Sequence, residues 1–242
     1  MRFELFPILD RMLYFYGKPL NPQRFYDYLE IMQGGTKDLL VPIANFNPMA
    51  KDHVLEKLLE LQKLDIEKVI QQELTLINKE IKNRKESSVF KVAFNLADDL
   101  KGGWTNRYST DYDNKYKLNA LVSRNFCVTL LWSSEEYSIE KIKSRIRETC
   151  HRTICWLDHP KPKTLEDHIN LERIIALKAK LNEPASDIDV QQMDAFYNEN
   201  KATDNYTILL NFLYGDQASI HLGLAPVGIK EDMAGFKYAR LQ

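Results

Sequence analysis

VFKVAFNL, residues 89–96, is the stretch of sequence that decides the fold class. Every second residue from Phe90 to Leu96 is apolar, and this period of two, with aromatic and β-branched side chains, is typical of a β-strand. NFCVTLLW, residues 125–132, has the same kinds of residue but is apolar at nearly every position. We therefore predict two strands here, and the second should be covered on both faces.

Helix signals dominate the chain on either side of these strands. Apolar residues recur with a helical period over residues 3–16. Asn21-Pro22 and Asn47-Pro48 predict two further helix starts, because asparagine can cap free backbone N–H groups and proline suits the first helical position. Ser133–Glu136 fits a capping box and predicts the start of another helix. Two short segments near the C-terminus are further strand candidates: SIHLGL, residues 219–224, and GFKYARL, residues 235–241.

The order of these elements indicates the fold class. Helices and strands do not alternate as they do in a doubly wound fold. We predict a helix-dominated α+β fold with about seven helices and a small mixed or antiparallel sheet of three to five strands. The predicted division is an N-terminal helical part, residues 1–86, and an α+β part, residues 87–242, unless the two form one continuous domain.

Composition excludes several classes of partner. The chain of 242 residues has 33 Lys and Arg against 34 Asp and Glu, so it lacks the basic excess that nucleic-acid binding requires. No stretch approaches the roughly 20 apolar residues that span a bilayer, so we expect no membrane partner. Three cysteines are too few for a disulfide framework and suit a reducing compartment. The expected location is the cytoplasm.

The segment between the two strands, residues 95–117, has a composition that folding does not readily explain. Gly102-Gly103 allows close approach of the backbone to a ligand, and Arg107 offers a planar fork for a carboxylate or phosphate. Its aromatic residues offer stacking faces, so the segment contains the parts of a small-ligand pocket. The candidate binding residues are Asp98, Asp99, Trp104, Arg107, Tyr108, Asp111, Tyr112 and Asp113.

The same segment has a purely structural interpretation. Tyr108, Tyr112 and Tyr116 recur every four residues, which is also the pattern of an amphipathic element, and Gly-Gly can be a simple turn. An EF-hand loop is excluded, because Lys115 and Tyr116 stand where an oxygen ligand and a glycine are needed.

Metal binding has one weak candidate elsewhere in the chain. Glu148, His151 and Cys155 should share one face of a helix, away from its apolar stripe. Histidine and cysteine four residues apart can reach one zinc ion, but no paired CxxC or HxxxH accompanies them. We therefore expect no metal and no cofactor.

The sequence contains no P-loop, GxGxxG, GxSxG or HExxH motif, so no known catalytic or nucleotide-binding motif indicates a function. The function hypotheses therefore rest on the residue patterns described above. The first hypothesis is a binding or regulatory protein that engages a protein partner or a small polar ligand through residues 95–117, with no catalytic residue assigned. The alternative is an enzyme acting on a small polar or anionic substrate, with Arg107 as anion clamp. Its acid–base groups would come from Asp98, Asp99, Asp111 and Asp113.

A third hypothesis is a nucleic-acid contact through the basic residues between positions 141 and 163. The oligomeric state is left open. Burial should separate the first two hypotheses. Carboxylates that converge with Arg107 in a concave pocket favour the enzyme, and the same residues spread over an exposed convex surface favour a partner interface.

Overall fold

The computed structural model describes residues 1–100, 105–181 and 188–241, which form two compact units. Unit 1 comprises residues 1–110 and 118–150, and unit 2 comprises residues 111–117 and 151–242. The division falls within two helices, α5 (Arg107–Tyr116) and α7 (Ile139–Asp158). No helix in the described ranges is both long and apolar enough to cross a bilayer.

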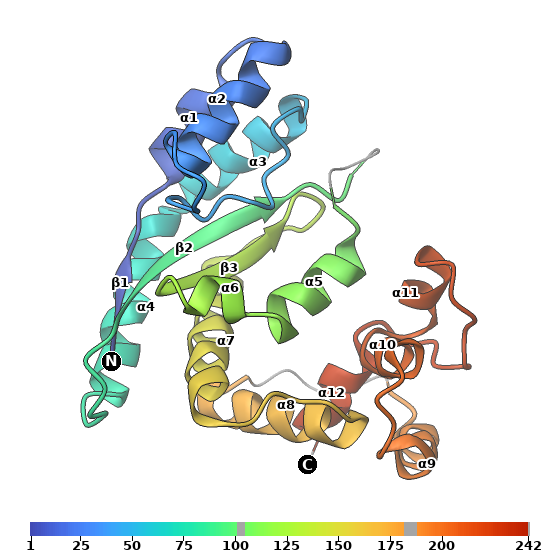
Figure 1. Ribbon diagram of the computed structural model, residues 1–242. Helices are drawn as coiled ribbons and strands as arrows, with labels where there is room; N and C mark the ends of the chain where they lie inside the picture. The colour runs from blue at the N-terminus through green and yellow to red at the C-terminus, as the bar shows by residue number, and fades with distance from the viewer. Residues whose placement is uncertain (101–104, 182–187, 242) are drawn as a thin grey trace. The chain divides into compact units, whose positions relative to one another are not determined.

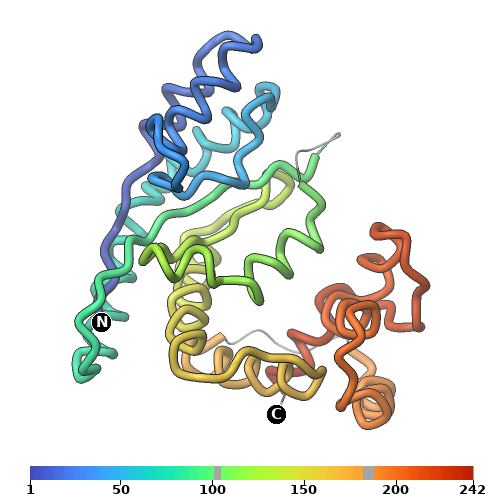
Figure 2. Tube along the Cα trace, in the orientation of Figure 1, coloured from blue at the N-terminus to red at the C-terminus, as the bar shows by residue number. Residues whose placement is uncertain are grey.

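Unit 1 contains a three-stranded sheet whose strands all run in the same direction (Figures 1 and 2). The strands are β1 (Arg2–Leu5), β2 (Val89–Ala97) and β3 (Phe126–Trp132), in that order across the sheet. The prediction of a mixed or antiparallel sheet is therefore wrong. Helices lie between successive strands, and such long crossovers are what parallel pairing requires.

Every residue of β3 is buried, which confirms the prediction of a strand covered on both faces. β1 was not predicted, because residues 3–16 looked like one helix. The strand has only four residues, and pairing with β2, Phe3 opposite Phe90, stabilises its extended backbone. The helix α4 packs against β1 (Figure 1). The other helices of unit 1 are α1 (Leu9–Tyr16), α2 (Pro22–Gln33), α3 (Asp52–Lys63), α4 (Ile66–Glu80) and α6 (Asn119–Val122).

Two similar helix-start signals have different outcomes in unit 1. Asn21 caps α2 as predicted, with its side chain accepting a hydrogen bond from the backbone N–H of Arg24. Asn47 starts no helix, because α3 begins only at Asp52. Its side-chain oxygen accepts from the backbone N–H two residues on, at 3.0 Å, but this bond closes a turn, and its amide donates to Asp98 at 2.8 Å.

The elements of unit 2 are all helices among the residues described. Besides the ends of α5 and α7, it contains α8 (Leu165–Ala179), α9 (Val190–Asn200), α10 (Tyr206–Tyr214), α11 (Asp216–His221) and α12 (Ala234–Arg240). Both C-terminal strand candidates are therefore wrong, since residues 219–224 form the end of α11 and a turn, and residues 235–241 lie almost wholly in α12. The described residues form twelve helices, ten of them with seven or more residues, where about seven were expected.

Packing explains why the last segment is helical. A Cβ atom on Gly235 would lie 2.8 Å from the backbone oxygen of Phe212, so the glycine lets α12 pack closely against α10. The residues at this contact are buried: Phe212 on α10, and Phe236 and Tyr238 on α12. The alternating apolar pattern of the segment is therefore the pattern of a short, deeply buried helix.

A buried histidine on α8 forms a defined hydrogen-bond chain in unit 2. The Nδ1 atom of His168 lies 2.7 Å from the carbonyl oxygen of Thr164, which can only accept, so this nitrogen carries the hydrogen. The other ring nitrogen, Nε2, can then accept from the hydroxyl of Tyr112, 3.2 Å away. His168 is therefore held as the neutral imidazole.

Acidification should destabilise unit 2 through His168. Burial lowers the pKa of His168, and nearby Arg152 acts in the same direction, although the Thr164 carbonyl and the Glu172 and Asp167 charges oppose them. The unfolded chain then binds a proton at higher pH than the folded chain does. The free energy of unfolding should fall as the pH drops from the ordinary value of 6.5 through the lower folded value.

Urea denaturation between about pH 7.5 and about pH 5.5 measures this effect. His168→Gln should reduce the pH dependence, and the matched change of the exposed His159 to glutamine should leave it as in the wild type. Equal pH dependence in the wild type and His168→Gln would contradict the assignment.

Candidate functional site

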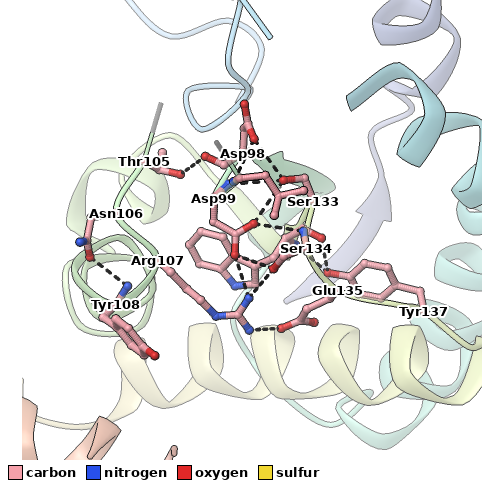
Figure 3. Close-up of polar contacts among 12 residues, drawn as sticks. Asp98, Asp99, Thr105, Asn106, Arg107, Tyr108, Ser133, Ser134, Glu135 and Tyr137 are labelled. Carbon is pink, nitrogen blue, oxygen red and sulfur yellow. Dashed lines mark hydrogen bonds and ion pairs between the residues drawn. The ribbon is translucent and has the colours of Figure 1, made fainter. Parts of the chain in front are cut away.

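The two longer strands end at the same edge of the sheet, because they are parallel. β2 is followed by Asp98 and Asp99, and β3 is followed by Ser133 and Ser134. Open parallel sheets bind ligands outside the carboxyl ends of their strands. We name this region the carboxyl edge, and Figure 3 shows its two aspartates, its two serines and Arg107. Asn47 and His53, which bond to Asp98, complete it.

Asp99 joins the end of β2 to the turn that follows β3. Its Oδ1 atom accepts a hydrogen bond from the backbone N–H of Ser134 at 3.1 Å, and Oδ2 accepts from the Ser134 hydroxyl at 2.6 Å. The Ser133 hydroxyl is 3.2 Å from Asp99 Oδ1. The capping box predicted at Ser133–Glu136 is therefore absent, because these serines bind Asp99 and α7 begins only at Ile139.

Arg107 is held among carboxylates of its own chain. It is the first residue of α5, whose start is fixed by Asn106, and its Nη1 atom donates to Asp99 Oδ2 at 2.9 Å. Nη2 donates to Glu135, and the guanidinium lies 5.2 Å from the centre of the Trp132 ring (Figure 3). Burial alone would lower the pKa of Arg107, but the charges of Glu135 and Asp99 outweigh it and raise the pKa. Arg107 is thus permanently charged, and both of its terminal nitrogens already donate to carboxylates of the same chain.

Asp98 is the most deeply buried group of the carboxyl edge, with 1% of its surface exposed. Its Oδ2 atom accepts from the Asn47 amide at 2.8 Å, and Oδ1 lies 2.8 Å from His53 Nε2 and 3.2 Å from the Ser133 hydroxyl. Burial alone would raise the pKa of Asp98, but the hydrogen bonds from Asn47 and His53 outweigh it and lower the pKa. Asp98 is therefore an ionised acceptor with a fixed orientation.

His53 lies in the first turn of α3 and faces this carboxylate. Because ionised Asp98 can only accept, Nε2 of His53 carries the hydrogen and Nδ1 is left as the basic nitrogen. The side chain is 29% exposed, so it is accessible from solvent while Asp98 is not. The loop before α3 is anchored by Tyr16, whose hydroxyl donates to the Asn47 carbonyl at 2.7 Å.

The structure brings together only part of the predicted site. Asp98, Asp99 and Arg107 converge at the carboxyl edge, whereas the ring of Tyr108 points away from Asp99 (Figure 3). Trp104 lies outside the described residues. The remaining candidates belong to unit 2: Asp111 is buried and bonded to Tyr214 and Lys115, Tyr112 is buried against His168, and Asp113 is exposed and paired with Lys117.

The sequence interpretation missed several residues of the carboxyl edge, namely Asn47, His53, Ser133, Ser134 and Glu135. His53 is a single histidine near the start of a helix, and it lies 45 positions from Asp98 in the sequence. A correct assignment of parallel strands would have placed Ser133 beside Asp98, but no local signal identified His53.

The weak metal candidate does not have the predicted exposure. His151 and Cys155 are 6% and 1% exposed, so they are buried and do not lie on an outward face. The Glu148 side chain is half-buried in unit 1. Within residues 1–100, 105–181 and 188–241, no three His, Cys, Asp or Glu residues are grouped so that they could hold a metal ion.

Four basic residues of α7 form ion pairs within their own units. These contacts give a structural reason for the positive charge that suggested a nucleic-acid partner. Lys141 and Arg145 pair with Glu135, Arg147 pairs with Glu73 and Glu80, and Arg152 pairs with Glu172.

Comparison with models of known protein families found no match, and searches of curated proteins and of solved structures found no similar protein either. The structure itself defines the class: a helix-rich α+β protein with a three-stranded parallel sheet and a polar cluster at the carboxyl ends of two strands.

Proposed function

We propose that this protein binds a small polar ligand at the carboxyl edge. The observation that carries the proposal is the convergence of Asp98, Asp99, Arg107, Ser133 and His53, which come from four separate parts of the chain. The side chains of Asp98 and Asp99 are 2% and 6% exposed, so they are not spread over a surface that a protein partner could cover. A small ligand therefore fits this arrangement better than a protein partner does.

The charges at the carboxyl edge favour an uncharged ligand. Arg107 already pairs with Asp99 and Glu135, so it is not free to act as the anion clamp of the enzyme hypothesis. The group best placed to meet a ligand is the half-buried His53, which can exchange hydrogen bonds with hydroxyl, amide or ester groups. The exposed Ser134 hydroxyl already donates to Asp99 and accepts from Arg107, so it borders the site and holds these two side chains in place. A cytoplasmic location is part of this proposal, and the small number of cysteines, three in all, supports it.

Titration of isotope-labelled protein with a library of small amides, polyols and esters tests the proposal by nuclear magnetic resonance. Shift changes should concentrate at His53, Asp98 and the Ser133–Ser134 turn. Ser134→Leu should weaken binding at least about tenfold, because it removes the hydroxyl that bonds Asp99 and Arg107 and places an apolar side chain at the edge.

Ser144→Leu provides the matched control, since Ser144 is an exposed serine on α7. It should leave binding unchanged. Binding confined to a different part of unit 1, such as the cavity of about 670 Å³ lined by Phe6, Tyr14 and Leu40, would contradict the proposal.

A further inference from the structure

We propose that the protein is a hydrolase of uncharged esters, in which His53 is the general base and Asp98 is its positioning residue. This inference rests on the proposed function, because the ester would occupy the carboxyl edge. It goes further by assigning a reaction, ester hydrolysis, and by making His53 the proton acceptor in place of the aspartates that the sequence patterns indicated.

The geometry of the pair matches the task of a base. Asp98 is fixed by Asn47 and Ser133, and it binds His53 Nε2 at 2.8 Å, which selects one tautomer and directs the basic Nδ1 away from the carboxylate. A buried carboxylate that holds one imidazole nitrogen also stabilises the imidazolium that forms when the other nitrogen takes a proton. The only ion-pair partner of Asp98 among the described residues is His53 itself, so this charge is available to the imidazolium.

The other polar groups at the edge are occupied in ways that exclude them as the base or nucleophile. Asp99 accepts hydrogen bonds from Ser134 and Arg107. Ser133 is 4% exposed, and its hydroxyl approaches the same Oδ1 atom of Asp98 that His53 binds. The serine and the histidine thus share one acceptor and do not form a nucleophile–base pair, which leaves water as the nucleophile.

The proposed reaction proceeds in two steps. His53 Nδ1 removes a proton from water as the water oxygen bonds to the ester carbonyl carbon, and the carbonyl π electrons move to oxygen. The tetrahedral intermediate then collapses, the bond to the alcohol oxygen breaks, and that oxygen takes the proton from the imidazolium. Ester and water become acid and alcohol, and His53 returns to its neutral form.

Hydrolysis of p-nitrophenyl acetate tests the inference directly. General-base catalysis contributes about 100-fold to 10,000-fold, so His53→Gln should lower kcat by a factor in that range. His159→Gln, the change of an exposed histidine in unit 2, should leave kcat unchanged. Equal kcat in the wild type and His53→Gln would overturn the inference.

Asp98→Asn separates positioning from folding. Ring-nitrogen spectra should show His53 as the Nε2–H tautomer in the wild type and as a mixture of tautomers in Asp98→Asn, with kcat reduced and KM little changed. If Asp98→Asn fails to fold, the kcat of His53→Gln still tests the inference. The His53 side chain is partly exposed, so its substitution should not prevent folding.

The outcomes also distinguish the inference from the proposed function on which it rests. If small esters bind at the carboxyl edge and the wild type does not hydrolyse p-nitrophenyl acetate above the rate of free imidazole, catalysis is overturned and binding stands. If the fragment library does not bind at the edge, both fail.

Discussion

Glu172→Gln should lower the unfolding free energy of unit 2 by about 3–5 kcal/mol. Glu172 and Arg152 are 5% and 3% exposed, and two hydrogen bonds of 2.5 and 2.8 Å join the carboxylate to the guanidinium. The Tyr116 hydroxyl also donates to Glu172, at 2.7 Å. Glutamine keeps the shape of the side chain but removes its charge, so the buried Arg152 loses its counter-ion.

Urea denaturation followed by circular dichroism measures this loss. Asp113→Asn is the matched control, because Asp113 forms an exposed ion pair with Lys117 whose side chains are 53% and 62% exposed. Exposed pairs contribute little to stability, so the control should unfold almost as the wild type does. The double variant Arg152→Met with Glu172→Leu should recover much of the stability, because neither charge of this pair is left buried without the other. Indistinguishable unfolding of Glu172→Gln and Asp113→Asn would contradict the buried pair.

Gly215→Ala should destabilise unit 2 by about 3 kcal/mol or more, through two effects that add. Gly215 joins α10 to α11 with φ +82° and ψ 175°, a backbone conformation that side chains rarely adopt. A Cβ atom there would also overlap the backbone oxygen of Glu231 and lie 3.2 Å from that of Ile229. Backbone atoms cannot relieve a clash by rotating, as a flexible side chain can. The clash would therefore force the backbone at Gly215 away from the backbone at Glu231.

Gly223→Ala separates the two effects. Gly223 also has a positive φ, +70°, but an added Cβ would meet nothing within 4 Å. Its substitution should therefore cost only the backbone strain, about 1–2 kcal/mol. The difference between the two variants in urea denaturation measures the steric part together with the extra backbone strain at Gly215, whose φ and ψ lie in a region almost exclusive to glycine. Equal losses would show that Gly215 is not closely approached by Glu231.

Local patterns were sufficient where a residue's neighbours in the sequence determine its conformation. The alternating residues from Phe90 to Leu96 predicted β2, and the apolar run from Phe126 to Trp132 predicted β3 and its coverage on both faces. Asn21 and Pro22 predicted the start of α2. The amphipathic interpretation of residues 108–116 agrees with α5, although Asp98, Asp99 and Arg107 from the same segment meet elsewhere.

The sequence by itself therefore determined the helix-rich class, two of the three strands and part of the polar cluster, because strand alternation and helix caps depend on residues a few positions apart. Only the tertiary structure decided that β1 exists, that the sheet is parallel, and that His53 meets Asp98. Each of these features depends on residues that are distant in the sequence. β1 depends on the pairing of Phe3 with Phe90, the parallel sheet on pairs such as Val92 with Cys127, and the polar contact on His53 with Asp98. Such pairs form because burial and hydrogen bonding offset the entropy of bringing distant segments together, and no local pattern reports that free energy.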